Sequence, residues 1–329
     1  MGGIPYDQGV SQGVSDPSSS PALSSAAPAL HHLALPAGSG AGGSPRRLAW
    51  WQWGSPTAPR VVVCVHGLTR QGRDFDVLSQ ALVEQAAGQV RVVCPDIAGR
   101  GYSDWLPDPM GYGMPTYACD MAALLAHLHQ QAPVSHLDWV GTSMGGLIAM
   151  AFFGTPALGG AWPLKRLVFN DVGPQIEWAA IERIKTYVGV PVVFDSLDQA
   201  TDFAVQSLVT FGPHTREQWA ALTRHQLRER PEGSYTFHYD PRIAQPFAQS
   251  TQAQHEEGTG YLWQVWDGLT APTLLLRGAD SDLLSAAAAQ AMTRRGPRAT
   301  LVEFPGVGHA PMLVVPDQVQ AVLEFLPPV

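Results

Sequence analysis

The sequence predicts an α/β protein in which a mostly parallel central sheet is flanked by helices. Short, continuous apolar runs alternate along the chain with helix-compatible stretches, which is the pattern of strands buried between two helical layers. A serine lies between glycines at a strand-to-helix junction, in residues 141–146. Residues 174–268 lack a convincing buried strand, interrupt the alternation and indicate a helical insertion.

The N-terminal part predicts a low-complexity tail followed by a sheet edge. Residues 1–28 are rich in Gly, Ser, Pro and Ala and contain little that can pack, so we expect a flexible tail. Residues 32–35 and 47–53 are strand candidates separated by a turn rich in Gly, Ser and Pro. That arrangement predicts an antiparallel pair at one edge of the sheet.

Buried strands and amphipathic helices then alternate. Continuous apolar runs predict strands at residues 60–65, 90–94, 137–140, 166–170, 273–277 and 300–304. Helical periodicity predicts helices at residues 74–87, 117–130, 144–153, 285–294 and 317–326. The expected core therefore comprises residues 29–173 and 269–329.

The insertion is predicted to form a helical cap over residues 174–268. Helical patterns occur at residues 176–188, 196–211, 215–230 and 261–266. We expect the tryptophans of this segment to pack on the sheet or on each other; they are Trp178, Trp219, Trp263 and Trp266. If the insertion lies over the serine turn, it forms a lid.

Composition excludes several classes of partner. The chain has 329 residues, of which 45% are apolar and 15% charged, enough for a sizeable core. The net charge is −8 and there is no basic run, which argues against nucleic acid or an anionic membrane as partner. No stretch approaches the roughly 18 apolar residues of a membrane span. The N-terminus lacks the charged and apolar regions of a secretory signal.

The cysteines and histidines predict neither disulfides nor a metal site. The three cysteines, Cys64, Cys94 and Cys119, are an odd number without metal-ligand spacing. Cys64 and Cys94 fall in strand-like runs, where buried free thiols are expected, and this favours a reduced, cytoplasmic setting. No His-Glu-x-x-His pattern occurs, so we expect no metal and no cofactor.

The turn around Ser143 has the pattern of a nucleophile elbow. It follows the apolar run at residues 137–140 and leads into an apolar, helix-compatible stretch that begins at Met144. Glycines on both sides suit a turn too sharp for Cβ atoms. The helix directs its free N–H groups and the positive end of its dipole at the serine. Ser143 is therefore the candidate nucleophile.

Five short motifs occur in order along the chain, at residues 66–70, 96–104, 141–146, 277–282 and 306–309. Together they resemble those of the α/β-hydrolase superfamily, especially bacterial serine hydrolases with a helical cap. The elbow and the terminal Gly-x-Gly-His are the most specific of them. The resemblance extends over roughly residues 30–329 and implies that fold for the core.

The resemblance implies a catalytic base and an acid. His309, on the loop after the last strand, is the expected base, because this fold orders its triad as Ser, acid, His. The family usually places the acid three or four residues after a glycine, and Asp282 is four residues after Gly278. Asp282 is therefore the expected acid and Asp280 the alternative. Asp171 is a third candidate, since some members carry an acid there.

Two backbone amides are expected to form an oxyanion hole. The Met144 N–H directly follows the nucleophile, and the Leu68 N–H follows His66 and Gly67 at the end of the neighbouring strand. We expect His66 to support this loop through hydrogen bonds and not to transfer protons. Asp96 is expected to fix loop backbone near the site.

A cluster of charged residues, Arg70, Arg73 and Asp74, lies just beyond this loop. It has two readings: local ion pairs at a solvated helix start, or recognition of substrate. The sequence leaves both open.

The expected activity is hydrolysis of small or medium apolar carboxylic esters through an acyl-enzyme, with a small-molecule ester as substrate. One alternative is a carbon–carbon bond hydrolase for products of aromatic-ring cleavage, with Arg183 and Lys185 facing an acidic substrate. Another is a non-enzymatic ligand receptor on the same scaffold. A dehalogenase or epoxide hydrolase is disfavoured, because those enzymes need aspartate at the elbow.

Overall fold

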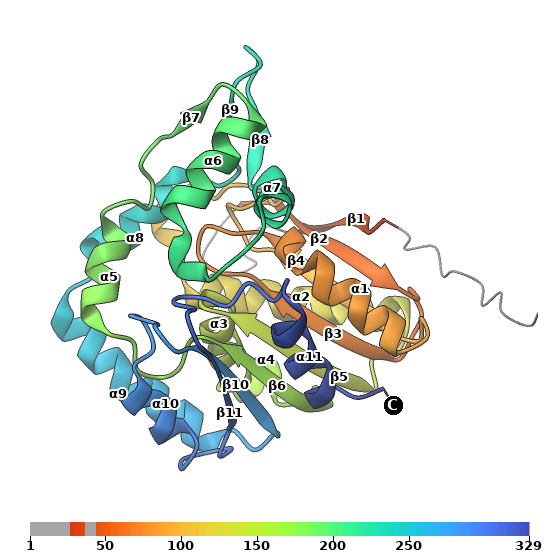
Figure 1. Ribbon diagram of the computed structural model, residues 1–329. Coiled ribbons are helices and arrows are strands. Elements are labelled where there is room, and N and C mark those ends of the chain that lie inside the picture. Colours follow the sequence, from red (N-terminus) through yellow and green to blue (C-terminus); the bar gives the residue numbers. More distant parts are fainter. Residues whose placement is uncertain (1–26, 37–43, 329) are drawn as a thin grey trace, which may run out of the picture.

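The computed structural model describes residues 27–36 and 44–328, so nearly all of the tail predicted for residues 1–28 lies outside the described residues. Its main feature is an eight-stranded sheet in the order β1-β2-β4-β3-β5-β6-β10-β11 (Figure 1). The sheet is antiparallel where β1 meets β2 and β2 meets β4, and parallel elsewhere. The strands are β1 (Ala29–Leu35), β2 (Arg46–Gly54), β3 (Arg60–Val65), β4 (Arg91–Asp96), β5 (His136–Thr142), β6 (Leu164–Asn170), β10 (Thr273–Gly278) and β11 (Thr300–Phe304). The predicted fold class is confirmed, including the antiparallel pair at the edge.

Helices cover both faces of the sheet because its strands are apolar on both sides. In β3, Val61, Val63 and Val65 belong to one buried cluster, and Val62 and Cys64 belong to another. The first cluster includes side chains of α2 (Met114–Gln131), α3 (Met144–Phe153) and α10 (Ala286–Met292). The second includes side chains of α1 (Asp76–Gln85) and α11 (Pro316–Phe325). Each face of the sheet thus has its own helical layer.

The insertion between β6 and β10 contains helices and one small sheet. The helices are α5 (Trp178–Lys185), α6 (Leu197–Ser207), α7 (Arg216–His225), α8 (Ala244–Gln249) and α9 (Gln252–Gly268), with short 3₁₀ turns at η4 (Val209–Phe211) and η5 (Pro241–Ile243). The sheet consists of β7 (Val193–Phe194), β9 (Tyr235–Phe237) and β8 (Leu227–Glu229), all antiparallel. The prediction of a purely helical insertion is wrong in this respect, because strands of two or three residues are too short to show periodicity.

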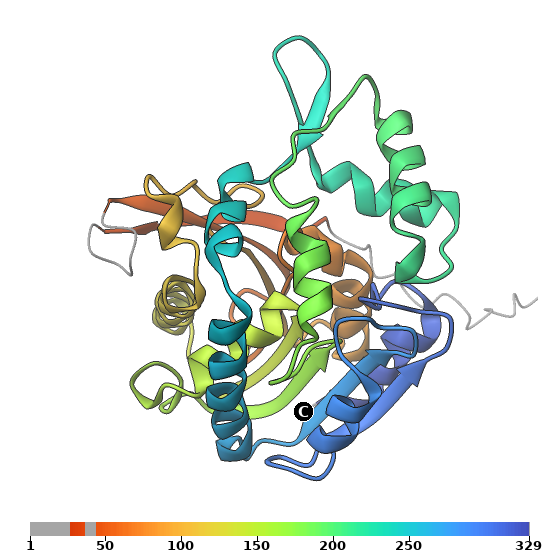
Figure 2. The same ribbon diagram turned by 90° about the vertical axis from the view of Figure 1, so that its left-hand side faces the viewer.

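Two parts of the insertion lie in different places. The part from α6 to β9 projects from the core (Figures 1 and 2). In contrast, α9 packs beside α3, and its Trp266 is fully buried in the main core cluster, with its ring 5.2 Å from that of Phe169. The expectation that a tryptophan of this segment packs on the sheet is confirmed for Trp266.

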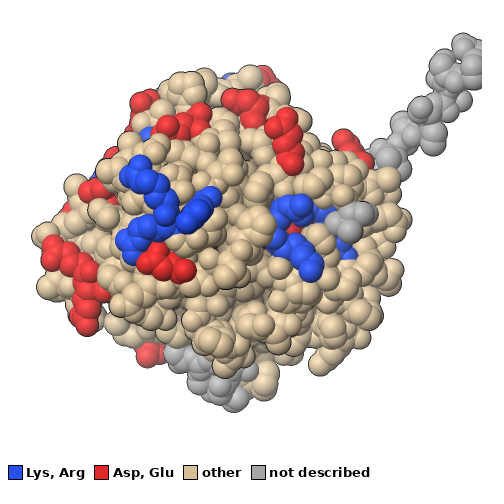
Figure 3. All heavy atoms as spheres, turned by 90° about the horizontal axis from the view of Figure 1, so that it is seen from below, with Lys and Arg blue, Asp and Glu red and all other residues tan. Residues whose placement is uncertain are grey.

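Charges on the face shown in Figure 3 are mixed: basic side chains gather in two small groups, with acidic side chains beside them. None of the helices in the described ranges is long and apolar enough to cross a membrane.

Two buried polar side chains fix the loops at the ends of β3 and β4, as the sequence predicted. The Ile97 N–H donates to Nε2 of His66 at 3.0 Å, so Nδ1 carries the proton and donates to the Gly67 carbonyl at 2.7 Å. Asp96 accepts hydrogen bonds from the N–H groups of Gly72 and Tyr102. Burial lowers the pKa of His66 to about 3, which keeps its ring neutral.

A buried ion pair holds the sheet edge to the helix layer, and its removal tests the packing. Arg46 at the start of β2 contacts Asp120 on α2, with Nη1 and Oδ2 2.9 Å apart, and the side chains are 2% and 1% exposed. Asp120→Ala leaves a buried guanidinium unpaired, so we expect a loss of about 3–5 kcal/mol in the free energy of unfolding. Urea unfolding measures it. The double variant Arg46→Met/Asp120→Leu should recover at least half of this loss. An equal loss in the single and the double variant would contradict the view that the unpaired guanidinium causes it.

The neutral state of His66 predicts a pH dependence of stability. Between pH 6.5 and about 3 the unfolded chain binds a proton at His66 that the folded chain does not, so acidification lowers the free energy of unfolding. In His66→Gln this contribution is absent. We expect a shallower acid-side slope for the variant, by at most about 1.4 kcal/mol per pH unit. Urea unfolding at pH 4, 5, 6 and 7 measures both slopes, and identical slopes would refute the prediction.

Candidate active site

Ser143 lies in a strained turn between β5 and α3. Its backbone has φ 51° and ψ −117°, a conformation that residues other than glycine rarely adopt. The turn is also tightly packed. A Cβ atom on Gly145 would lie 2.0 Å from the Val65 carbonyl oxygen, and one on Gly141 would lie 2.5 Å from the Gly145 backbone. Gly145 is therefore required by the close approach of the elbow to β3, and Gly141 by the close approach of the turn to its own backbone.

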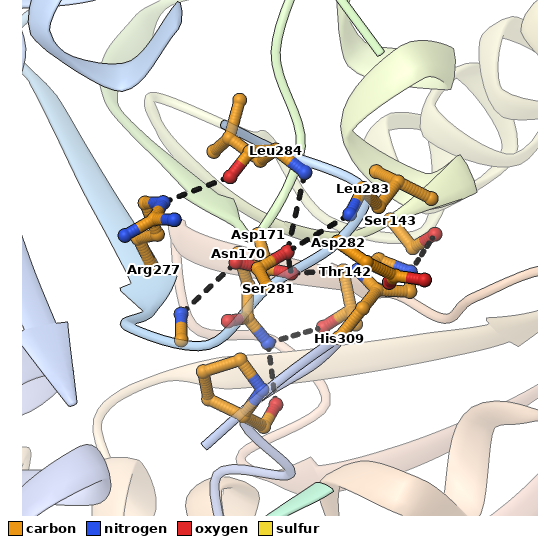
Figure 4. Close-up of polar contacts among 12 residues, drawn as sticks. Thr142, Ser143, Asn170, Asp171, Arg277, Ser281, Asp282, Leu283, Leu284 and His309 are labelled. Atoms are coloured by element: carbon orange, nitrogen blue, oxygen red, sulfur yellow. Dashed lines mark hydrogen bonds and ion pairs between the residues drawn. The ribbon is translucent and has the colours of Figure 1, made fainter. Parts of the chain in front are cut away.

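Ser143, His309 and Asp171 form a continuous chain of hydrogen bonds (Figure 4). Nε2 of His309 is 2.9 Å from Oγ of Ser143, and its Nδ1 is 2.7 Å from Oδ2 of Asp171. His309 comes from the loop after β11, and Asp171 directly follows β6. The structure thus brings together the expected nucleophile and base with Asp171, the third of the candidate acids, which follows a different strand from Asp282.

Asp171 is fully buried and accepts two further hydrogen bonds. The Gly278 N–H donates to its Oδ1 at 2.9 Å, and the Ser281 hydroxyl donates to its Oδ2 at 2.6 Å. Asp171 itself has a positive φ of 55°, which turns the chain sharply after β6. The carboxylate therefore joins the ends of β6 and β10 to the histidine loop.

The prediction that Asp282 lies against His309 is wrong. Asp282 points outward and pairs with Arg183 of α5, at 2.6 Å to Nε and 2.9 Å to Nη2. Both side chains are about half exposed. Asp280, the alternative, is also exposed. In this loop it is Ser281 that faces inward, toward Asp171, so its neighbours on either side face solvent.

Arg100 supports the loop that carries Leu68. Its buried guanidinium donates to the carbonyls of Leu68 and Ala98 and to the Tyr117 hydroxyl, and its Nη2 lies 3.7 Å from Sδ of Met144. No carboxylate within the described residues forms an ion pair with it. No local pattern indicates this contact, because Arg100 lies in a glycine-rich loop far along the chain from Leu68.

A cavity of about 520 Å³ opens beside Ser143 and His309. Its walls come from the loops after β3, β5 and β11 and from the insertion. The wall formed by the insertion is mostly apolar; it includes Ile184, Val188, Val190, Phe203, Leu208 and Phe237. The cavity therefore suits a largely apolar small molecule next to the serine.

The charged cluster beyond β3 divides between the cavity and its surroundings. Arg70 and Asp74 line the cavity and form an ion pair at 2.6 Å, whereas Arg73 pairs with Asp76 and is not among the residues that line it. Asp74 also accepts a hydrogen bond from Nε2 of Gln226 at 2.8 Å. The interpretation as local ion pairs outside the site therefore applies to Arg73, whereas Arg70 faces the site.

The insertion is held to the site by main-chain hydrogen bonds. The Gly308 N–H, next to His309, donates to the Thr210 carbonyl at 2.5 Å. On the other side, Gly101 N–H donates to the His238 carbonyl at 2.9 Å, and Asp240 N–H donates to the Gly99 carbonyl at 2.7 Å. The loops of His309 and Arg100 are therefore both bound directly to the insertion.

Comparison with known proteins agrees with this architecture. Residues 62–323 match the alpha/beta hydrolase family. The 3-hydroxybutyrate-oligomer hydrolase of Cupriavidus necator is 43% identical over 282 residues, which is 85% of this chain and 92% of that protein. An α/β hydrolase from Novosphingobium aromaticivorans has a TM-score of 0.74 at 32% identity, over 90% of this chain and 98% of that one. For E-2-(acetamidomethylene)succinate hydrolase, the TM-score of 0.68 at 21% identity, over 91% and 99%, reflects the fold alone. The chain therefore belongs to the α/β-hydrolase family.

Proposed function

We propose that this chain is a serine-dependent carboxylic-ester hydrolase with Ser143 as nucleophile, His309 as base and Asp171 as acid. The observation that carries the proposal is the unbroken hydrogen-bond chain from the buried Asp171 carboxylate through His309 to the Ser143 hydroxyl. A serine hydroxyl becomes a strong nucleophile only when a base removes its proton during attack. In this arrangement Asp171 keeps the proton on Nδ1, so that Nε2 faces the serine as an acceptor.

The reaction follows from these contacts. The Ser143 oxygen attacks the ester carbonyl while Nε2 takes its proton, and the imidazolium then returns that proton to the departing alcohol oxygen. Water, activated by the same nitrogen, next attacks the acyl-enzyme and releases the acid. The N–H groups of Leu68 and Met144 are the proposed oxyanion donors, and neither has an acceptor among the described residues. The N-terminus of α3 adds its positive dipole end at the same place.

We propose short oligoesters of 3-hydroxy acids as the substrate class. The support is the 43% identity to a 3-hydroxybutyrate-oligomer hydrolase along most of both chains. The cavity agrees, because its size is within the range for small-molecule sites and its apolar wall can receive the short side chains of such units. Residues 174–268 are the proposed cap; those that line this cavity lie between Arg183 and Tyr239, whereas α9 packs beside α3. A cytoplasmic setting also stays a proposal, supported by the free thiols of Cys64, Cys94 and Cys119.

Removal of the nucleophile tests the mechanism. We expect Ser143→Ala to reduce kcat on p-nitrophenyl butyrate and on a linear 3-hydroxybutyrate trimer by roughly 10³-fold or more, because the acyl-enzyme no longer forms. Release of p-nitrophenol and of monomer measures it, with circular dichroism to verify folding. Full activity in the variant would exclude the mechanism. Faster wild-type turnover of a ring-fission dienoate than of either ester would favour the carbon–carbon hydrolase, and one slow turnover with retained product would favour the receptor.

A matched pair of aspartate variants tests the choice of acid. Asp171→Asn should reduce kcat by roughly 10³-fold or more, because the amide no longer favours the productive tautomer and the imidazolium. Asp282→Asn removes only a half-exposed ion pair, which contributes about 1 kcal/mol at most, so activity should stay within roughly threefold of wild type. Steady-state kinetics on both esters compare them. A larger loss of kcat in Asp282→Asn than in Asp171→Asn would identify Asp282 as the acid.

A further inference from the structure

One charged side chain in the cavity has no part in the mechanism above. Arg70 lines the cavity and lies next to the nucleophile: Gly67 separates the two, since a Cβ atom on this glycine would lie 3.6 Å from Ser143 Cβ and 3.7 Å from Arg70 Cγ. An ester held at Ser143 therefore shares the cavity with the Arg70 side chain.

The guanidinium is held rigidly and keeps donors free. Its Nε and Nη2 donate to Asp74 at 2.6 and 2.8 Å, and its Nη1 has no acceptor among the described residues. Asp74 is in turn held by Gln226 of the insertion. Burial raises the pKa of Asp74, and the neighbouring Arg70 opposes this effect. A guanidinium whose Nε and Nη2 are held by one carboxylate can still donate from Nη1 to a second oxygen ligand.

The cavity contains another arginine that offers a comparison. Arg183 has the same two-atom pairing, with Asp282, but both partners are about half exposed, whereas Arg70 and Asp74 are 16% and 9% exposed. Water screens the exposed guanidinium, so an anion gains less there. Of the two arginines, Arg70 is the stronger anion site and the one beside the nucleophile.

We propose that Arg70 binds the free carboxylate of the substrate's terminal unit, on the alcohol side of the bond that is cleaved. This inference rests on the proposed function. In an oligomer of 3-hydroxybutyrate, the end carboxylate is separated from the nearest ester carbonyl by one hydroxy-acid unit, about 5 Å when extended. Serine attack breaks the bond from the acyl carbon to the unit's alcohol oxygen, which takes the proton from His309. The product released first is thus a single 3-hydroxy acid, bound through its carboxylate.

The test compares substrates that differ only in this charge. A linear 3-hydroxybutyrate trimer is assayed as the free acid and as its terminal carboxamide, which is neutral and adds no ester. Wild type should prefer the free acid. In Arg70→Met, KM for the free acid should rise about 10- to 100-fold, with the carboxamide within about threefold of wild type, because only the charge-assisted contact is lost. The matched control is Arg73→Met, which removes a neighbouring arginine of equal exposure, also paired with an aspartate, from outside the cavity.

Two further variants keep the test decisive. Arg70→Met/Asp74→Asn avoids an unpaired buried carboxylate and should show the same selective loss even if the single variant folds poorly. Equal losses on both trimers, no wild-type preference for the free acid, or a selective loss in Arg183→Met would each overturn the proposal. If the wild-type protein does not hydrolyse p-nitrophenyl butyrate at all, the esterase function itself is refuted. Failure of the proposed function and failure of the Arg70 proposal are therefore distinguishable.

Discussion

The site depends on the hydrogen bonds that the Asp171 carboxylate accepts. This carboxylate is fully buried, and it accepts hydrogen bonds from His309, from the Ser281 hydroxyl and from the Gly278 N–H. His309 and Ser281 come from the loops after β11 and β10, Gly278 ends β10, and Asp171 itself follows β6. A buried carboxylate is stable only when such donors surround it, so the three strand ends are held in one arrangement. The imidazole is thereby placed 2.9 Å from the serine hydroxyl.

Most of the fold, and the positions of Ser143 and His309 in the site, could be predicted from the sequence. The strands of the main sheet are long enough to show continuous apolar runs. The elbow has a glycine whose reason is local, because a Cβ atom on Gly141 would lie 2.5 Å from the Gly145 backbone. The acid could not be predicted in this way. In residues 278–284 three polar side chains follow one another, and which one faces inward depends on the turn of the backbone and on a carboxylate more than a hundred residues earlier. Asp171 follows a predicted strand like an ordinary loop residue, so only the family resemblance makes it a candidate, and it ranks third.

The charged cluster after β3 shows the same limit. Arg70 and Arg73 each pair with an aspartate one helical turn ahead, so local spacing does not distinguish them. The distinction comes from Gln226, which reaches Asp74 from the end of α7 and closes that side of the cavity. The short strands β7 to β9 escaped prediction for a related reason, since their pairing is set by contacts between distant segments and not by composition.

The main-chain hydrogen bonds from Gly308 to Thr210 and between residues 99–101 and 238–240 give the insertion a second role besides lining the cavity. They hold in place the loops that carry His309 and Arg100. Cutting the insertion back to enlarge the cavity would therefore also remove the hydrogen bond next to His309. Smaller side chains at Phe203 or Phe237, which line the cavity from α6 and β9, would enlarge the cavity and keep these hydrogen bonds.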